Sequence, residues 1–553
     1  LGGRIPTVTE VGAFLASKDA ARRSTLIDSL LESPDWVSHF YNTWASTLRL
    51  SEGTGNGWFF FEPYLAWIKQ SIADNRPYDD WVRNMLTADG KTWQNPAVGF
   101  QLRDADMPLP YVDNTVRVFL GTQIGCAQCH DHPFEDWTQR QFYELAAFTS
   151  GTRVSQRDRR LLPDGRREPL HPYMVNLELV MKGFRSPEKY GKLPGDESKN
   201  LRWLELSNLR RIDFLDETIS LPDDDGAPGE IVEPRVPWGE VPEEARSLDS
   251  RAQLASWMTS HDNRQFARTI ANRLWRFCFG IGVVEPIDDF RDGNAPSNPE
   301  LLEHLTDLML AVDFDQREFV RTIVSTKAWQ RRAVAYDATS GVAHDFRAPI
   351  LRRMSAEQAW DSLLAITCRD IWAYQREAGE ASDSLRAFDN AIMNADLESA
   401  HAALQDFSRR DTREKLHQRL KKDLTFRHEA LARASELPLP LRPERFLRVF
   451  GQGDREMIDG ERRVATMPQV LSLWNSHAVA MVIDDGSLLM ETIAANDSRL
   501  TLDIIFLAIL ARAPTASDRA LIDHHVAQSQ KPLNGVNDVI WALLNTREFL
   551  FVQ

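Results

Sequence analysis

Five consecutive residues, Cys126-Ala127-Gln128-Cys129-His130, form the most specific chemical pattern in the chain. Two cysteines at this spacing, followed directly by a histidine, are the attachment pattern of a c-type haem. Each thiol bonds a vinyl group and the imidazole ligates the iron. The sequence therefore predicts one covalent haem c, anchored by Cys126 and Cys129, with His130 as the metal ligand.

Two other interpretations of the cysteine pair stay open. A site for another metal, such as zinc, needs a second ligand pair, and the remaining cysteines, Cys278 and Cys368, stand alone. A structural or thioredoxin-like redox pair is the other alternative, although the redox type needs a βαβ setting and the surrounding pattern is helical. We favour the haem, and we expect Cys278 and Cys368 to be buried free thiols that behave as small apolar residues.

Two neighbours of the motif, Arg117 and His132, are candidate haem-binding residues. Because a guanidinium group pairs well with a carboxylate, Arg117 can bind a haem propionate, and an ion pair within the protein is an equally good interpretation. His132 can donate to a propionate, point into the distal space of a neighbouring group or cap the local backbone, and we favour the structural role. The sixth iron ligand is open among five side chains: His171, Met174, His261, His344 and His477.

A second polar set, Asp288, Asp289 and Arg273, lies far along the chain from the motif. Paired carboxylates can transfer protons or bind a cation. We prefer the simpler interpretation for this set, which is ion pairing and loop capping.

Helical periodicity and capping signals predict the elements that position the motif. Asp113 is expected to cap a helix that delivers the motif at its C-terminal end. Four apolar residues share one face of that helix: Val116, Phe119, Leu120 and Ile124. Thr138 and Gln141 form a capping box for the next helix. The haem site is therefore predicted to be a loop between two helices.

The same signals predict a mainly α fold, a multi-helix assembly. Residues 1–150 form a helical domain with the haem-attachment site, and residues 246–553 form a second helical domain. Between them, scattered proline, glycine and charge at 151–245 predict an irregular connector with a few short strands. We expect it to help wall the haem pocket through His171 and Met174. The charged tract from Arg409 to Arg433 is predicted to be a solvated helix.

Composition limits the partners and the compartment. Of the 553 residues, 43% are hydrophobic and 26% charged, which is typical of a globular protein. We find no apolar run of 18 residues, so we expect no transmembrane segment in this chain. A formal net charge of −15 argues against nucleic acid and suits a basic partner. The haem-attachment motif places the protein in the periplasm or outside the cell, and we expect residues to precede Leu1.

Longer strings resemble a known family. Arg117 to Gly121 (RVFLG), the stretch CAQCHDHPFEDWTQ and Tyr143 to Phe148 (YELAAF) closely resemble the planctomycete-type cytochrome c-like proteins. That family joins a 1549-type and a 1553-type domain of unknown function. Strings similar to the second domain are Leu254 to Asn263 (LASWMTSHDN), Phe266 to Trp275 (FARTIANRLW), Phe279 to Phe290 (FGIGVVEPIDDF), Met354 to Gln358 and Trp541 to Phe551 (WALLNTREFLF). The resemblance covers nearly the whole chain.

Two positions depart from the family pattern. Asn298 stands where family members have histidine, and Gly460 stands where they have cysteine. No metal or redox role is carried over to these two positions.

The resemblance implies an extracytoplasmic haem protein, often encoded beside sulfatase-like partners, and it implies no particular reaction. We expect a c-type haem protein that transfers electrons to a redox partner protein. It would serve as the redox subunit or the catalytic body of a haem-dependent oxidoreductase acting on a large substrate such as a polysaccharide. The alternative is a non-catalytic binding or scaffold protein whose motif is structural or binds another metal.

Overall fold

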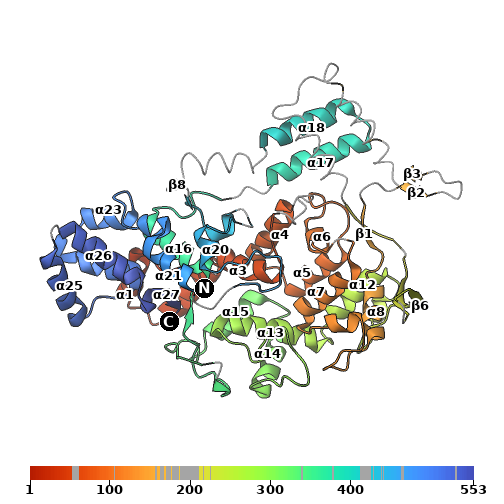
Figure 1. The fold of residues 1–553 in the computed structure, drawn as a ribbon, viewed down its shortest axis with the longest axis horizontal. Coiled ribbons are helices and arrows are strands. Elements are labelled where there is room, and N and C mark those ends of the chain that lie inside the picture. Colours follow the sequence, from red (N-terminus) through yellow and green to blue (C-terminus); the bar gives the residue numbers. More distant parts are fainter. Residues whose placement is uncertain are drawn as a thin grey trace.

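The computed structural model confirms the mainly α-helical fold (Figure 1). The structure describes residues 1–52, 61–104, 106–155, 159–161, 167–169, 176, 186, 211–215, 217–223, 226–337, 340–375, 379–410, 425–426, 429–437, 439, 441–461, 466–529 and 532–552. Among these residues, no helix has both the length and the apolar character needed to cross a bilayer.

The first part of the chain folds into helices, and α8 begins where its capping signal predicted it. These elements are α1 (Val8–Ala16), α2 (Arg22–Leu31), α3 (Pro34–Thr47), α4 (Glu62–Ala73), α5 (Tyr78–Thr87), η1 (Pro96–Val98), α6 (Gly99–Leu102), α7 (Pro108–Leu120), η2 (Gly125–Gln128) and α8 (Gln139–Ala147). Thr7 and Thr138 form the capping boxes of α1 and α8. Ser33 caps α3 by accepting a hydrogen bond from the Trp36 N–H.

Short strands pair in antiparallel two-stranded sheets. The pairs are β1 (Thr152–Ser155) with β4 (Arg211–Phe214), β2 (Arg159–Leu161) with β3 (Arg167–Pro169), β5 (Ile219–Pro222) with β6 (Pro228–Val232), β7 (Arg352–Arg353) with β10 (Phe551–Val552), and β8 (Thr425–Phe426) with β9 (Glu429–Ala430). Strands β1 to β6 all fall within 151–245, which confirms the few short strands predicted there. His171 and Met174 lie outside the described residues.

Helices dominate the chain again after residue 242. They are η3 (Glu243–Ala245), α12 (Ser250–Met258), α13 (Arg264–Phe279), α14 (Pro299–Ala311), α15 (Gln316–Val324), α16 (Ala356–Thr367), α17 (Gly379–Met393), α18 (Leu397–Arg410), η5 (Ala434–Glu436), α20 (Phe446–Phe450), α21 (Met467–Asn475), α22 (His477–Ala480), α23 (Leu488–Ala495), η6 (Ser498–Leu500), α24 (Thr501–Leu510), α25 (Ala516–Gln528), α26 (Pro532–Leu544) and α27 (Arg547–Leu550). In Figure 1, α17 and α18 project from one side of the molecule.

In the described part of the chain, two large hydrophobic cores hold most of these helices together, and a small separate cluster contains Trp93, Leu385 of α17 and Phe407 of α18. The first extends along the chain from Ile27 to Phe346 and takes in Ile458 from further on. The second extends from Met354 to Phe549. The N-terminal helix α1 packs against α24 at the second core, next to the blue C-terminal helices of Figure 1. Packing thus groups the first third of the predicted second domain with residues 1–150, while the domain boundaries themselves stay a prediction.

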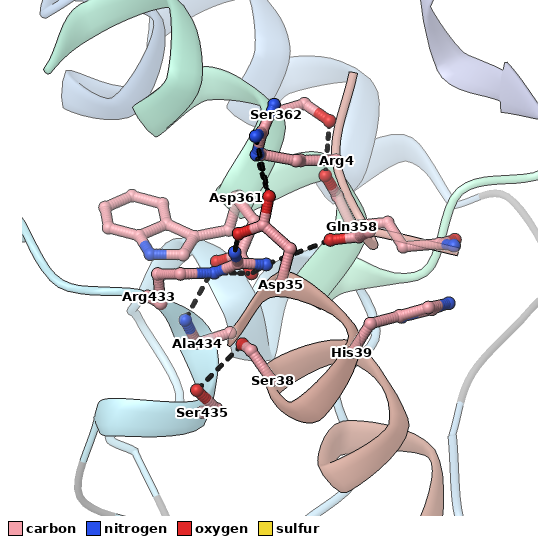
Figure 2. A network of polar contacts seen from close by, with 12 residues as sticks. Arg4, Asp35, Ser38, His39, Gln358, Asp361, Ser362, Arg433, Ala434 and Ser435 are labelled. Carbon is pink, nitrogen blue, oxygen red and sulfur yellow. Dashed lines mark hydrogen bonds and ion pairs between the residues drawn. The ribbon is translucent and has the colours of Figure 1, made fainter. Parts of the chain in front are cut away.

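A buried polar network joins the two cores (Figure 2). The Arg433 side chain is fully buried, and its guanidinium group pairs with Asp35 of α3 and, at 2.8 Å, with Asp361 of α16. It also lies 4.7 Å from the centre of the Trp372 ring. Asp361 accepts a further hydrogen bond from the Ala434 N–H at 2.9 Å. Both carboxylates are buried, so the Arg433 guanidinium group compensates charge on both sides of the junction, and Arg4 adds a second ion pair to Asp35 at 2.6 Å.

The prediction of a solvated helix from Arg409 to Arg433 is wrong for residues 425–426 and 429–433, whereas Arg409 and Arg410 are helical and end α18. Residues Thr425–Phe426 and Glu429–Ala430 form the β8–β9 pair, and Arg433 is buried. Interspersed charges predict a solvated helix only when they pair with one another. Arg433 instead pairs with carboxylates from two distant helices, which the local pattern does not reveal.

Candidate haem-attachment site

The helix before the motif, α7, begins earlier and ends earlier than predicted. Pro108 occupies its first turn, where a missing N–H costs nothing, so Asp113 is not its cap. Gly121 ends the helix in a left-handed conformation with a φ of +66°. The motif is therefore not part of this helix and occupies the separate 3₁₀ turn η2, between α7 and α8.

The variant Gly121→Ala is expected to lower the free energy of unfolding by at least about 1 kcal/mol, because the left-handed conformation is unfavourable for residues with a Cβ atom. The added Cβ atom would also lie 2.7 Å from the Phe290 ring. Denaturant titration measures the effect. The control Gly12→Ala places a methyl group in α1 with nothing within 4 Å, and it should be neutral or stabilising. Equal losses in both variants would contradict the prediction.

The two cysteines of the motif lie one above the other on the turn. The Cys129 N–H donates to the Cys126 carbonyl at 3.4 Å. Side chains three residues apart in a 3₁₀ turn eclipse each other. Both cysteines are exposed free thiols, whereas Ala127 between them is fully buried. The turn is thus anchored through its alanine and presents both thiols to the outside.

The imidazole of His130 is exposed and held by the backbone. Its Nδ1 atom lies 2.7 Å from the Asp131 carbonyl oxygen. Because a carbonyl oxygen only accepts, Nδ1 carries the proton in this contact and Nε2 keeps its lone pair. A metal-ligating histidine is usually oriented in this way through its other nitrogen. The residues present therefore fit covalent haem attachment: two accessible thiols and one imidazole nitrogen with a free lone pair.

The carboxylate of Asp113 fixes the turn through hydrogen bonds to its backbone. It accepts hydrogen bonds from the backbone N–H groups of Ile124 and Gly125, and burial raises its pKa while Arg117 and these bonds oppose the rise. A Cβ atom at Gly125 would lie 3.0 Å from the Asp113 carboxylate. A glycine at the first position of the turn lets this carboxylate approach closely. The sequence signalled Asp113 as a helix cap, and its role in fixing the turn was missed.

The segment after the motif closes back on it. The His132 N–H donates to the Trp137 carbonyl at 2.7 Å, and the Gln139 N–H donates to the Asp131 carboxylate at 2.8 Å. The Gln139 side chain also donates to the Gln128 carbonyl at 3.3 Å. These bonds tie the loop to the start of α8, so the motif has fixed neighbours on both sides.

The two predicted neighbours have protein partners. The Arg117 guanidinium donates to the Asp288 carboxylate at 2.5 Å. The structure therefore contains the ion pair that was one of the two interpretations of Arg117. The His132 Nδ1 atom accepts from the Phe134 N–H at 3.3 Å, which is the local capping that we favoured. The Phe134 ring beside it is 78% exposed. The propionate-binding roles of Arg117 and His132 stay predictions.

Comparison with protein families gives two matches along the chain. The model described as PSD1, protein of unknown function (DUF1553), matches residues 250–526, which is half of the chain. The chain belongs to this family. The model described as PSCyt2, protein of unknown function (DUF1549), matches residues 1–154, which include the motif. The resemblance to proteins that join these two domains is thus confirmed. No curated protein and no solved structure matches the chain.

Within the DUF1553 match, the departing residue Asn298 has a structural role. Its side-chain oxygen accepts from the Leu301 N–H at 3.0 Å and caps α14. The second polar set predicted from sequence is likewise engaged in ion pairs. Asp288 pairs with Arg117, Asp289 pairs with Arg291 at 3.1 Å, and Arg273 pairs with Asp459 at 3.3 Å. These contacts support ion pairing over proton transfer for this set.

Three of the other candidate iron ligands, His261, His344 and His477, lie in the part of the chain that matches DUF1553. His261 pairs with Asp313 at 3.0 Å, and His477 is an exposed residue at the start of α22. His344 is buried between the rings of Tyr336 and Phe346, and burial lowers its pKa. Among the described residues, no group of three or more His, Cys, Asp and Glu side chains is placed to hold a metal ion.

In the haem-free chain, iodoacetamide at pH 8 is expected to modify Cys126 and Cys129 well before Cys278. Cys278 is a buried free thiol, as predicted, and burial raises its pKa to about 12. Cys368 is also free but only half-buried, and burial raises its pKa to about 11. The thiolate is the reactive form, so a high pKa and low exposure both slow the reaction. Peptide mass spectrometry over time measures the order, with denatured protein as the control. Equally rapid modification of Cys278 would contradict it.

Proposed function

We propose that this protein is an extracytoplasmic c-type haem protein that transfers electrons. Cys126 and Cys129 are the thioether anchors, and His130 is the proximal iron ligand. The observation that carries the proposal is the motif on an exposed 3₁₀ turn, with Nδ1 of His130 bonded to the Asp131 carbonyl and Nε2 available. When bound, a haem supplies one-electron chemistry that none of these side chains provides.

The residues around the motif have distinct tasks in this proposal. The Asp131 carbonyl fixes the tautomer and the orientation of His130, which raises the basicity of Nε2. The Asp113 carboxylate and the buried Ala127 hold the turn rigid, so the thiols and the imidazole keep their relative positions. The exposed Phe134 ring offers apolar surface next to the motif.

Exposure of the motif favours electron exchange with another protein over reaction in an enclosed pocket. The formal net charge of −15 suits a basic redox partner, because complementary charge speeds diffusional encounter. We propose that the partner belongs to an oxidoreductase system acting on a large extracytoplasmic substrate such as a polysaccharide, with this chain as its redox subunit or body.

The decisive experiment is to produce the chain in a host with c-type haem maturation. The denatured protein should gain the mass of one haem, and its pyridine haemochrome spectrum should be that of a haem with two thioether bonds. A colourless chain under these conditions, or one that carries zinc, would overturn the proposal and favour a binding or scaffold protein.

A further inference from the structure

Helix α21 exposes a stripe of apolar side chains, and its sequence contains no charged residue. The stripe consists of Met467, Val470, Leu471 and Trp474, which are 71, 37, 48 and 49% exposed. At 3.6 residues per turn, these four positions lie within about 100° of one another around the helix axis. Away from the stripe, Gln469 and Leu473 are buried, and Leu473 belongs to the second core. The helix thus buries one face in the protein and leaves an apolar face outside.

Trp541 of α26 extends the stripe onto a second helix. Its ring centre lies 6.3 Å from that of Trp474, and its Nε1 atom donates to the Trp474 carbonyl oxygen at 3.2 Å. Trp541 is itself 39% exposed. Both helices lie in the blue C-terminal part of Figure 1. The four stripe residues and Trp541 form one exposed surface, the α21 patch, and contiguous apolar surfaces of this kind mark interaction sites.

The composition of the α21 patch is that of the centre of an interface between proteins. Such centres are enriched in Trp and Met and depleted of Lys, Glu and Asp. Tryptophan is also among the residues that most often contribute large binding energies. The patch contains two Trp and one Met and no charged residue. A partner therefore binds it through apolar contact and not through ion pairs.

Charge selects among the possible partners. A basic protein docks where carboxylates complement it, and helices that lie on a membrane surface carry Lys and Arg beside their apolar face. Helix α21 has neither kind of residue, and the one charged residue of α26, Asp538, lies 3.1 Å from Nε2 of His525. A second copy of this chain carries the same net charge of −15, so two copies repel each other unless they meet through an uncharged face.

We infer that the α21 patch is the interface of a symmetric dimer of this chain. In a twofold dimer the same surface lies on both sides of the interface, so that surface must complement itself. An uncharged apolar stripe meets this condition, because two copies of α21 pack along their stripes with side chains of each in the grooves of the other. The inference does not rest on the haem proposal, because no residue of the motif belongs to the patch.

The experiment is sedimentation velocity of the full chain over a range of concentrations. The parent should sediment as a dimer with twice the mass of one chain. The measurement is made in about 0.1 M and about 1 M sodium chloride, between which the Debye length falls from about 10 to about 3 Å. The dimer should be no weaker at the higher concentration, because salt screens the repulsion between two acidic copies. Haem-free Cys126→Ala/Cys129→Ala protein should dimerise equally, which keeps this inference separate from the haem proposal.

Leu471→Glu should raise the dissociation constant of the dimer at least tenfold, because it places a carboxylate within the stripe of both copies. Met467→Glu is a second variant with the same expected effect. An acidic residue in the first turn suits the helix dipole of α21, so this variant should fold normally. Leu521→Glu is the matched control, since Leu521 is a 72% exposed leucine of α25 outside the patch. Circular dichroism should show the same helical content in all three variants.

A parent chain that is monomeric at every concentration would overturn the inference. A dimer that survives both Leu471→Glu and Met467→Glu, or that Leu521→Glu weakens equally, would overturn it as well, because the interface would then lie elsewhere. Dissociation at high salt would show that ion pairs hold the dimer and would also overturn it. So would flotation of a monomeric parent with phosphatidylcholine vesicles, which would assign the patch to a membrane surface.

Discussion

The double variant Cys126→Ala/Cys129→Ala is expected to carry no covalent haem, and each single variant is expected to keep one thioether bond at most. A thioether bond needs the thiol of its own cysteine, and no other exposed free thiol exists among the described residues. The measurement is the intact mass of the denatured chain, together with its haemochrome spectrum.

Folding should survive this double change. Both thiols are exposed, and the buried anchor of the turn, Ala127, is untouched. Circular dichroism should therefore show unchanged helical content, which separates lost attachment from lost structure. Cys278→Ala is the matched control, because that buried thiol should leave haem content unchanged. Full haem content in the double variant would refute the assignment of Cys126 and Cys129.

The candidate haem-attachment site could be predicted because its reactive residues are close together in the sequence. Cys126, Cys129 and His130 lie within five residues of sequence, and their spacing alone predicts thioether attachment. Local capping could be predicted for the same reason: the box at Thr138 depends on two residues three positions apart, Thr138 and Gln141, and it formed as predicted.

The end of α7 was mispredicted because apolar periodicity continued across it. Ile124 is fully buried like Leu120, yet Gly121 has already ended the helix. A buried residue in the following turn keeps the helical spacing by coincidence, whereas the left-handed glycine decides where the helix stops.

The ion pairs between distant segments could not be predicted. Arg273 was grouped with Asp288 when its carboxylate partner is Asp459. The packing of distant segments decides which charged residues pair, and the local sequence pattern around each residue does not reveal it.

Arg433 gives the clearest case of such pairing, and Arg433→Leu is expected to lower the free energy of unfolding by about 3 to 5 kcal/mol. Removing one partner of a buried ion pair leaves the remaining charges uncompensated in a poorly solvating interior. Here the charge left without an ion-pair partner is Asp361, which is 1% exposed, whereas Asp35 keeps its ion pair with Arg4 at 2.6 Å. Urea unfolding at neutral pH measures the loss.

The control is Arg246→Leu. Arg246 forms an exposed ion pair with Glu240 at 2.6 Å, with the two side chains 56% and 82% exposed. Exposed pairs contribute at most about 1 kcal/mol, because water and salt screen them. A loss in Arg433→Leu no larger than in this control would contradict the assignment of Arg433 as the compensating charge at the junction.

The same variant should show a distinct pH dependence. Burial raises the pKa of Asp361 to about 6 in the folded protein, although Arg433 opposes the rise. Without the guanidinium group this pKa rises further, while in the unfolded chain it stays near 3.9. The folded variant then binds the proton more tightly than the unfolded chain, so its stability falls as the pH rises from about 4 through its folded pKa, whereas the fall in the parent ends near pH 6. The loss relative to the parent should be larger at pH 7.5 than at pH 5, and an equal loss at both values would show that Asp361 is not the group left without a partner.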